Sequence, residues 1–297
     1  MTASSRGFCI CTISSGRALP DSGAPARPVL PALIVVPARF GSTRLPGKPL
    51  LKIAGRTLLE RVVATARAAS ALAGNCEVVV ATDDEHIAAH ARDLGAEVAL
   101  TDAALDSGSS RACAAAEQRS RFPALVINLQ GDAPFIPPSI VAGLIATLRA
   151  GDADVATPVY RLDWDRLDRL RTHKIIAPFS GTTCARGADG RALWFSKTIL
   201  PAIRDEAALR ESALSPVWQH LGLYGYRMAA LQWFASTPPT PYERLEGLEQ
   251  LRFLEHGRTI ATVEVEASQH ALSGIDTPAD IAAAEAAIAR LGDPFPG

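Results

Sequence analysis

The sequence predicts an α/β fold in which a doubly wound, mostly parallel, Rossmann-like sheet carries a smaller antiparallel lobe. Two observations lead to this prediction. Between residues 32 and 150, apolar segments alternate with capped, helix-like segments, which is the order of a parallel sheet with helices on both faces. After Ala150 several strand-like segments follow one another with fewer helices between them, which favours antiparallel pairing.

Four apolar segments before Ala150 are expected to be strands, at residues 33–36, 78–81, 97–100 and 125–129. The first is continuously apolar, as in a strand that is buried on both faces. Helices are expected between these strands. They begin at a capping box at residues 57–60, at a second cap at 82–85, at residue 109, and at the proline pair 137–138.

Beyond Ala150, strands are expected at residues 154–160, 174–177, 191–196, 219–227 and 259–265. Residues 191–196 follow a glycine-containing loop and are predicted to pair back on 174–177. Leucines at every third position predict a helix over 242–256. Thr277 is a helix N-cap followed by proline, so the last helix is expected to begin there.

Composition excludes several classes of partner. The 297 residues carry a formal charge of −1, so neither nucleic acid nor an anionic membrane is expected to bind. No apolar run approaches the roughly 18 residues of a membrane span. The five cysteines are scattered without a C-x-x-C motif, which argues against disulfides and a zinc site and fits a reducing, cytoplasmic location.

The loop at residues 37–50, directly after the first strand, combines glycines with basic side chains. Gly41 and Gly47 allow the backbone to come close to a ligand. Arg39, Arg44 and Lys48 suit phosphate oxygens, so the loop is predicted to bind a triphosphate. It is not a Walker loop, because proline follows Lys48, and no G-x-G-x-x-G motif occurs. A basic surface loop is the alternative.

Arg39, Thr82 and Asp132 each follow a predicted parallel strand. Because ligands of open α/β sheets lie beyond the carboxyl ends of the strands, these residues are expected to converge in one crevice. Asp132 follows a glycine at a strand end and could hold Mg²⁺, and Asp276 is a second candidate. A turn or helix-capping role is the alternative for both carboxylates.

Six motifs, in order, resemble the cytidylyltransferases that act on 3-deoxy-D-manno-octulosonate (Kdo), a family with the nucleotide-diphospho-sugar transferase fold. The resemblance covers residues 32–292. It is carried by residues 37–50 (PARFGSTRLPGKPL), 79–83 (VVATD), 128–132 (NLQGD), 220–227 (HLGLYGYR), 248–252 (LEQLR) and 274–278 (GIDTP). It implies CTP and Kdo as substrates, Mg²⁺ as cofactor, a homodimer, and a role in lipopolysaccharide or capsule synthesis.

The resemblance also implies roles for individual residues. Arg39, Lys48 and Asp132 would be catalytic, and Asp132 and Asp276 would bind the metal. The residues matching the CTP site are Ala38, Arg39, Ser42, Arg44, Lys48, Arg111 and Gln130. Those matching the sugar site are Lys197, His220, Tyr224, Glu249 and Gln250. For Arg111 a solvated surface position, and for His220 and Tyr224 a structural role in a half-buried strand, are the alternatives.

In this family the anomeric hydroxyl of the sugar attacks the α-phosphorus of CTP and pyrophosphate leaves in line. Positioning and charge neutralisation then supply most of the catalysis. Mg²⁺ is expected at the α-phosphate and the attacking oxygen, where it lowers the pKa of the hydroxyl. Arg39, Ser42, Arg44 and Lys48 would stabilise the leaving pyrophosphate, and no side chain stands out as a general base.

The sequence departs from the family pattern at three positions. Ser110 and Ala133 stand where the family has glutamates, and Lys197 stands where it has an arginine. Lysine cannot make the bidentate carboxylate contact of arginine. Two alternatives therefore stay open: a cytidylyltransferase for a modified Kdo or another 2-ulosonate, and a non-catalytic nucleotide- or sugar-binding paralogue.

Residues 1–31 are rich in Ser, Pro, Gly and Ala and are expected to form a disordered N-terminal extension, with a transit peptide as the alternative. Residues 32–292 are expected to form a single domain. Its parts would be a nucleotide-binding part (32–150), a sugar-binding and dimerisation lobe (151–265), and a C-terminal metal-site loop and helix (266–292).

Overall fold

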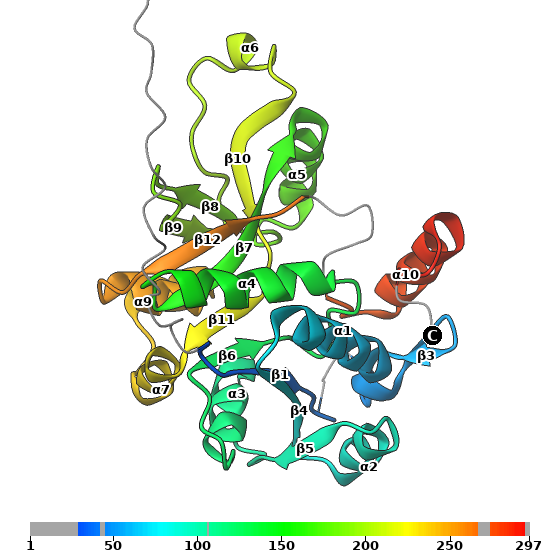
Figure 1. The fold of residues 1–297 in the computed structure, drawn as a ribbon. Helices are drawn as coiled ribbons and strands as arrows, with labels where there is room; N and C mark the ends of the chain where they lie inside the picture. The colour runs from blue at the N-terminus through cyan, green and yellow to red at the C-terminus, as the bar shows by residue number, and fades with distance from the viewer. Residues whose placement is uncertain (1–28, 42–44, 106, 267–273, 295–297) are drawn as a thin grey trace, which may run out of the picture.

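The computed structural model describes residues 29–41, 45–105, 107–266 and 274–294. Within these residues ten strands form one sheet, and a small hairpin of β2 (Lys52–Ile53) and β3 (Arg56–Thr57) lies outside it. One half of the large sheet is parallel (Figure 1). Its strands follow in the order β5 (Glu97–Leu100), β4 (Cys76–Thr82), β1 (Ala32–Pro37) and β6 (Leu125–Asn128).

The sheet continues beyond β6 into an antiparallel half. Its strands follow in the order β11 (Tyr224–Arg227), β7 (Val155–Asp163), β10 (Leu214–His220), β8 (Thr183–Arg186) and β9 (Ala192–Ser196). A further strand, β12 (Ile260–Glu264), pairs with β7 in parallel. The predicted fold class is confirmed, with the antiparallel lobe joined edge to edge to the parallel sheet.

Helices cover both faces of the parallel half, because β1 is apolar on both. Ile34 and Val36 pack in one cluster with α1 (Leu58–Ala73) and α4 (Pro138–Ala150). Leu33 and Val35 pack in a second cluster with residues of α3 (Gly108–Glu117) and α7 (Met228–Ser236). All four strand residues are almost fully buried. This burial on two faces is what the continuously apolar segment predicts.

The predicted strand at residues 174–177 is wrong. Lys174 belongs to the last turn of α5 (Trp164–Ile176), which begins where the Asp163 carboxylate accepts a hydrogen bond from the Arg166 backbone N–H. Ile175 and Ile176 are 81% and 82% exposed. These two β-branched residues favoured a strand in the sequence, but they do not lie in a buried strand. The antiparallel partner of β9 is β8 instead.

Two other predicted elements are each divided in two. The helix expected over 242–256 consists of α8 (Pro241–Glu246) and α9 (Gln250–Glu255), separated at Gly247, whose φ is +62°. Glycine adopts this left-handed conformation without strain and ends a helix. The strand expected over 219–227 is the end of β10 and all of β11, which are separated by residues 221–223.

The C-terminal helix α10 (Pro278–Leu291) begins with the predicted cap, since the Thr277 side chain accepts a hydrogen bond from the Asp280 backbone N–H. It lies beside the β2–β3 hairpin (Figure 1). Ala284 of the helix and Ile275 before it share a small apolar cluster with Leu58 and Phe135.

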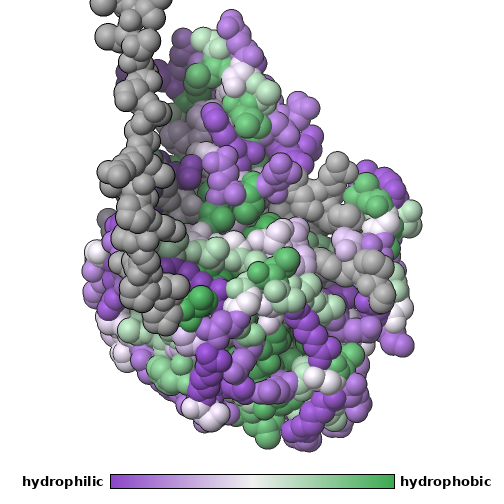
Figure 2. Space-filling model, viewed as in Figure 1, coloured by the Kyte–Doolittle hydropathy of each residue, from purple (hydrophilic) through white to green (hydrophobic). Residues whose placement is uncertain are grey.

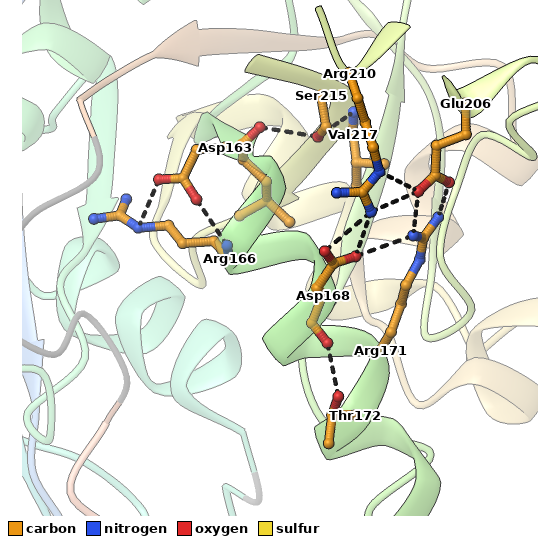
Figure 3. A network of polar contacts seen from close by, with 10 residues as sticks. Asp163, Arg166, Asp168, Arg171, Thr172, Glu206, Arg210, Ser215 and Val217 are labelled. Atoms are coloured by element: carbon orange, nitrogen blue, oxygen red, sulfur yellow. Dashed lines mark hydrogen bonds and ion pairs between the residues drawn. The ribbon is translucent and has the colours of Figure 1, made fainter. Parts of the chain in front are cut away.

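An arm formed by β10, α5 and α6 (Glu206–Leu209) projects from the antiparallel half (Figure 1). An ionic network joins its helices: Arg171 and Arg210 both contact Asp168 and Glu206 (Figure 3). The shortest of these contacts is the 2.6 Å between Arg171 Nη2 and Glu206 Oε2. The side-chain hydrogen bonds from Arg171 and Arg210 lower the pKa of the Glu206 carboxyl to about 2.

Three cysteines lie within the described residues, Cys76, Cys113 and Cys184, and all three have free thiols. No helix in the described ranges is long and apolar enough to cross a membrane. The predicted N-terminal extension lies almost entirely outside the described residues, so it stays a prediction.

Candidate functional site

Two adjoining cavities open at the carboxyl ends of β1 and β6. The first has a volume of about 400 Å³ and the second about 510 Å³. Gln130 and Asp132, which follow β6, line both cavities. The two cavities therefore meet at the end of β6, and ligands bound in them would contact each other there.

The first cavity is lined by four segments: the end of β1, the loop containing Lys48, the start of α3 and the end of β6. Arg39 and Asp132 lie in its wall, as the position of the strand ends predicts. The same prediction is wrong for Thr82. Its side chain is fully buried, accepts a hydrogen bond from the Asp84 backbone N–H at 3.2 Å, and lines neither cavity.

Gly131 is required by the close approach of two strand ends. A Cβ atom at this position would lie 2.5 Å from the carbonyl oxygen of Pro37, a distance that real Cβ contacts do not reach. Glycine therefore allows the end of β6 to pack directly against the end of β1. This packing brings Asp132 beside the basic loop.

The Lys48 ammonium lies between two carboxylates. Its Nζ is 2.8 Å from Asp132 Oδ2 and 3.0 Å from Asp276 Oδ1. Lys48 is buried, whereas the side chains of Asp132 and Asp276 are 36% and 46% exposed and can still reach a ligand. One nitrogen contacts both carboxylates, so the two predicted metal ligands converge on a single point.

Asp276 is held there by contacts at the start of α10. The backbone N–H of Ile275 donates to the Asp132 carbonyl oxygen at 2.9 Å. The Asp276 backbone N–H donates to Asp280 Oδ2, also at 2.9 Å.

Two carboxylates with open positions for phosphate oxygens and water match the preference of Mg²⁺. Within the described ranges no group of three or more His, Cys, Asp or Glu side chains could hold a metal ion. The metal-binding role of Asp132 and Asp276 stays a prediction, and a pair of carboxylates suits Mg²⁺ better than zinc.

Arg111 lies in the first cavity with its guanidinium held in place. It donates to Thr101 Oγ1 at 2.5 Å, to Asp83 Oδ2 at 3.2 Å and to the Leu105 carbonyl oxygen at 3.2 Å. Only 2% of the residue is exposed, so the alternative of a solvated surface arginine is wrong. The fixed guanidinium is suited to recognising a planar polar edge.

Gln130 and Ala38 complete the part of the wall near Arg111. The Gln130 side-chain amide donates to Asn128 Oδ1 at 3.1 Å, so its oxygen is not used in that bond. Ser42 and Arg44, also predicted to bind the nucleotide, lie outside the described residues.

Lys197, His220 and Tyr224, for which sugar binding is predicted, line the second cavity. Burial, with a smaller contribution from the Lys197 charge, lowers the pKa of His220 to about 3, so its imidazole is neutral near pH 7. His220 Nε2 is hydrogen-bonded to Thr157 Oγ1 at 2.8 Å. Burial raises the pKa of Tyr224, so it keeps its hydroxyl proton and donates it to Gln250 Oε1 at 2.9 Å.

Glu249 and Gln250 do not line either cavity. Glu249 Oε2 accepts a hydrogen bond from Ser109 Oγ at 2.9 Å, and Gln250 is only 2% exposed. Gln250 instead supports Tyr224 from behind the cavity wall. The prediction that these two residues border the sugar therefore becomes a supporting role for Gln250.

Several wall residues were not predicted. Thr182, Gly181, Gln219 and Tyr160 line the second cavity, and Ser107 and Gly108 line the first. The helix cap at Ser107, whose Oγ accepts from the Ser110 backbone N–H, was a signal available in the sequence. Of the three departures from the family pattern, Ala133 and Lys197 line the second cavity, whereas Ser110 lines neither.

A family model described as "Cytidylyltransferase" matches residues 33–260. The 3-deoxy-manno-octulosonate cytidylyltransferase of Maricaulis maris (strain MCS10) is 41% identical over 264 residues, which cover 88% of this chain and 98% of that protein. The enzyme of the same name from Zea mays is 36% identical over 256 residues, covering 86% of this chain and 80% of that protein.

Among solved structures, that of a CMP:2-keto-3-deoxy-manno-octonic acid synthetase complexed with CTP superposes with a TM-score of 0.75. Its sequence is 33% identical, and the match covers 88% of this chain and 99% of that one. A cytidylyltransferase from Leptospira borgpetersenii shares the fold, with a TM-score of 0.56 at 20% identity.

The buried His220 predicts a pH dependence of stability. An unfolded histidine has a pKa of about 6.5, so between this value and about 3 the unfolded chain binds the extra proton. Stability from this residue is thus fully present above pH 6.5 and is lost as the pH falls towards 3. When the pH is lowered from 7 to 5, the free energy of unfolding should fall in both proteins. We expect the fall to be about 1–2 kcal/mol smaller in His220→Gln than in the parent protein, as measured by urea titration.

His86 supplies the control, because its side chain is 85% exposed. His86→Gln shows how far the loss of an exposed histidine alone changes the difference between the two pH values. An identical difference in His220→Gln would mean that His220 does not remain neutral in the folded state.

Proposed function

The chain belongs to the cytidylyltransferase family, among the 3-deoxy-manno-octulosonate cytidylyltransferases, and on that premise we propose that it transfers CMP from CTP to the anomeric hydroxyl of Kdo. Pyrophosphate is the second product. The observation that carries the proposal is the position of Asp132. It contacts Lys48 in the phosphate-binding loop and lines both cavities, so it lies where a nucleotide and an acceptor would meet.

The first cavity is assigned to CTP. Arg111 and the Gln130 side-chain oxygen, with the backbone near Ala38, offer donors and an acceptor for the polar edge of cytosine. Arg39 and Lys48 lie along the same cavity, where their positive charges would neutralise the triphosphate.

The second cavity is assigned to the acidic sugar. Lys197 is its cationic wall residue and would meet the carboxylate. His220 is buried and Tyr224 half-buried, both are neutral, and they offer the polar groups that sugar hydroxyls require.

Mg²⁺ is proposed to bind Asp132 and Asp276, where it would neutralise phosphate charge and lower the pKa of the attacking hydroxyl. Lys48 forms ion pairs with both carboxylates, so its ammonium lies beside the proposed metal position. Lys48 and Arg39 would then stabilise the charge on the leaving pyrophosphate.

No histidine in the second cavity is suited to act as a general base. His220 has a pKa of about 3 and bonds Thr157, so it would bind a proton too weakly near pH 7. Catalysis is therefore assigned to positioning and charge neutralisation, as in other phosphoryl transfers.

A homodimer in the bacterial cytoplasm, serving lipopolysaccharide or capsule synthesis, completes the proposal. Three large apolar side chains near the end of α5 support the dimer: Ile175, Ile176 and Phe179 are 81%, 82% and 74% exposed. Apolar residues also interrupt the hydrophilic surface of the arm that carries α5 and α6 (Figure 2). A second copy of the chain would remove such a surface from water.

A modified Kdo or another 2-ulosonate is the alternative substrate. Ala133 and Lys197 both line the second cavity, so the departures from the family pattern lie where the sugar would bind. A small residue at Ala133 leaves room for a substituent, and lysine offers a point charge in place of a planar fork.

Pyrophosphate release from CTP and Mg²⁺ distinguishes these substrates, with Kdo, 8-amino-Kdo and N-acetylneuraminate offered separately. We expect release with Kdo. Release only with another sugar would keep the mechanism and change the substrate. Binding of CTP without release for any sugar would contradict the proposed activity and favour the non-catalytic paralogue.

Asp132→Asn is expected to lower turnover by about a hundredfold or more, because it removes a charged metal ligand, while CTP still binds. Lys48→Ala should weaken CTP binding as well as turnover, since its ammonium is assigned to the phosphates. Steady-state kinetics and CTP titrations measure both effects. Asp152→Asn is the control, because Asp152 pairs with Arg191 and lines neither cavity. Unchanged turnover in Asp132→Asn would remove Asp132 from the metal site.

A further inference from the structure

Lys174, in the last turn of α5, directs its ammonium at backbone carbonyls rather than at a carboxylate. Its Nζ lies 2.5 Å from the carbonyl oxygens of Ser180 and Lys197, 3.1 Å from that of Gly181 and 3.3 Å from that of Pro178. A single side chain thus joins the end of α5, the loop before β8 and the residue after β9. Neither the family resemblance nor the proposed mechanism gives this lysine a role.

Two of the four residues whose carbonyl oxygens Lys174 binds belong to the wall of the second cavity. Gly181 and Lys197 both line that cavity, as does Thr182, the neighbour of Gly181. The Lys174 ammonium in this position joins two neighbouring segments of the wall, which precede β8 and follow β9.

Lys197 is held at three points. Its carbonyl oxygen accepts from Lys174, its backbone N–H donates to Glu246 Oε2 at 2.7 Å, and its Nζ donates to Thr182 Oγ1 at 3.2 Å. Glu246 is itself held, because its other oxygen accepts from Ser196 Oγ at 2.7 Å. The backbone of Lys197 therefore has little freedom, although its side chain is long.

Burial lowers the pKa of Lys174, the nearby Lys197 charge lowers it further, and the Glu246 carboxylate opposes both effects. Burial also lowers the pKa of Lys197, against the opposing effect of Glu246. An anionic group in the cavity would relieve the repulsion between the two ammonium groups.

We propose that Lys174 is a positioning residue of the sugar site: it binds the carbonyl oxygens of Gly181 and Lys197 so that the Lys197 ammonium meets the carboxylate of a 2-ulosonate. The proposal rests on the assignment of the second cavity to the sugar. It explains how a lysine, which lacks the planar fork of arginine, is given a fixed direction.

The test compares Lys174→Met with Arg149→Met in steady-state kinetics. Arg149 is a matched control: it donates to the carbonyl oxygens of Leu30, Ala73, Gly74 and Asn75, and it lines neither cavity. We expect Lys174→Met to raise the KM for Kdo about tenfold and to leave the KM for CTP within about twofold, because the wall of the second cavity alone loses a charged hydrogen-bonding support. Arg149→Met should leave both KM values unchanged, whatever it does to the melting temperature.

Lys174→Arg provides a second variant, which keeps the charge and should recover part of the KM for Kdo. An unchanged KM for Kdo in Lys174→Met would overturn the proposal. Equal increases in both KM values, with no rescue by arginine, would also overturn it and leave Lys174 a merely structural role.

Failure of the proposed function gives a different result. If the wild-type protein releases no pyrophosphate, Kdo binding is measured by calorimetry with CTP present, in Asp132→Asn and in Asp132→Asn with Lys174→Met. Weaker Kdo binding in the double variant would support the role of Lys174 in a protein without turnover. Equal binding, or no binding in either protein, would contradict it.

Discussion

The contact of the Lys48 ammonium with Asp132 and Asp276 is the constraint on which the site depends. It joins three segments that are far apart in the sequence: the loop after β1, the end of β6 and the start of α10. Two carboxylates and one ammonium leave this group with a net negative charge, which favours a further cation. The same group lies beside Arg39, so the positive charge needed for phosphates is close by. Asp132 lines both cavities, so it marks the boundary between the proposed nucleotide and acceptor cavities.

The surrounding fold holds these three side chains in place. The absence of a side chain at Gly131 lets β6 approach β1, and this approach sets the position of Asp132. Asp276 depends on α10, whose far end is held by an ion pair between the fully buried Arg61 and Asp293, with a shortest distance of 2.8 Å. Arg61 also donates to the Ile53 carbonyl oxygen of the β2–β3 hairpin. The Asp293 side chain is 26% exposed and that of Arg61 is fully buried, so this partly buried pair joins the end of α10 to α1 and the hairpin through contacts outside the site.

The sequence predicted what local signals and general topology decide. Apolar strands, helix caps and the position of ligands beyond strand ends were enough to bring Arg39 and Asp132 to one cleft. The predicted strand at 174–177 was wrong. Ile175 and Ile176 are residue types that favour strands, but the segment that forms a strand here is the one that pairs with β10. Trp218 of β10 pairs with Cys184, so the segment at 183–186 forms the strand.

The proposed role of Lys174 could not be predicted from the sequence, because its carbonyl partners lie on segments that come together only in the folded chain. Thr82 failed for another reason: a strand-end position does not decide whether a side chain faces the ligand or is buried, as Thr82 is, with a hydrogen bond from the next turn of the chain.

The most direct test of the central claim is the binding of Mn²⁺, a paramagnetic substitute for Mg²⁺, measured by electron paramagnetic resonance with CTP present. If Asp132 and Asp276 hold one cation together, the wild-type protein binds Mn²⁺ with CTP, and Asp276→Asn weakens that binding about tenfold or more without preventing CTP from binding. Equal Mn²⁺ affinity in Asp276→Asn and the wild-type protein would contradict the account, because the start of α10 would then have no part in the metal site.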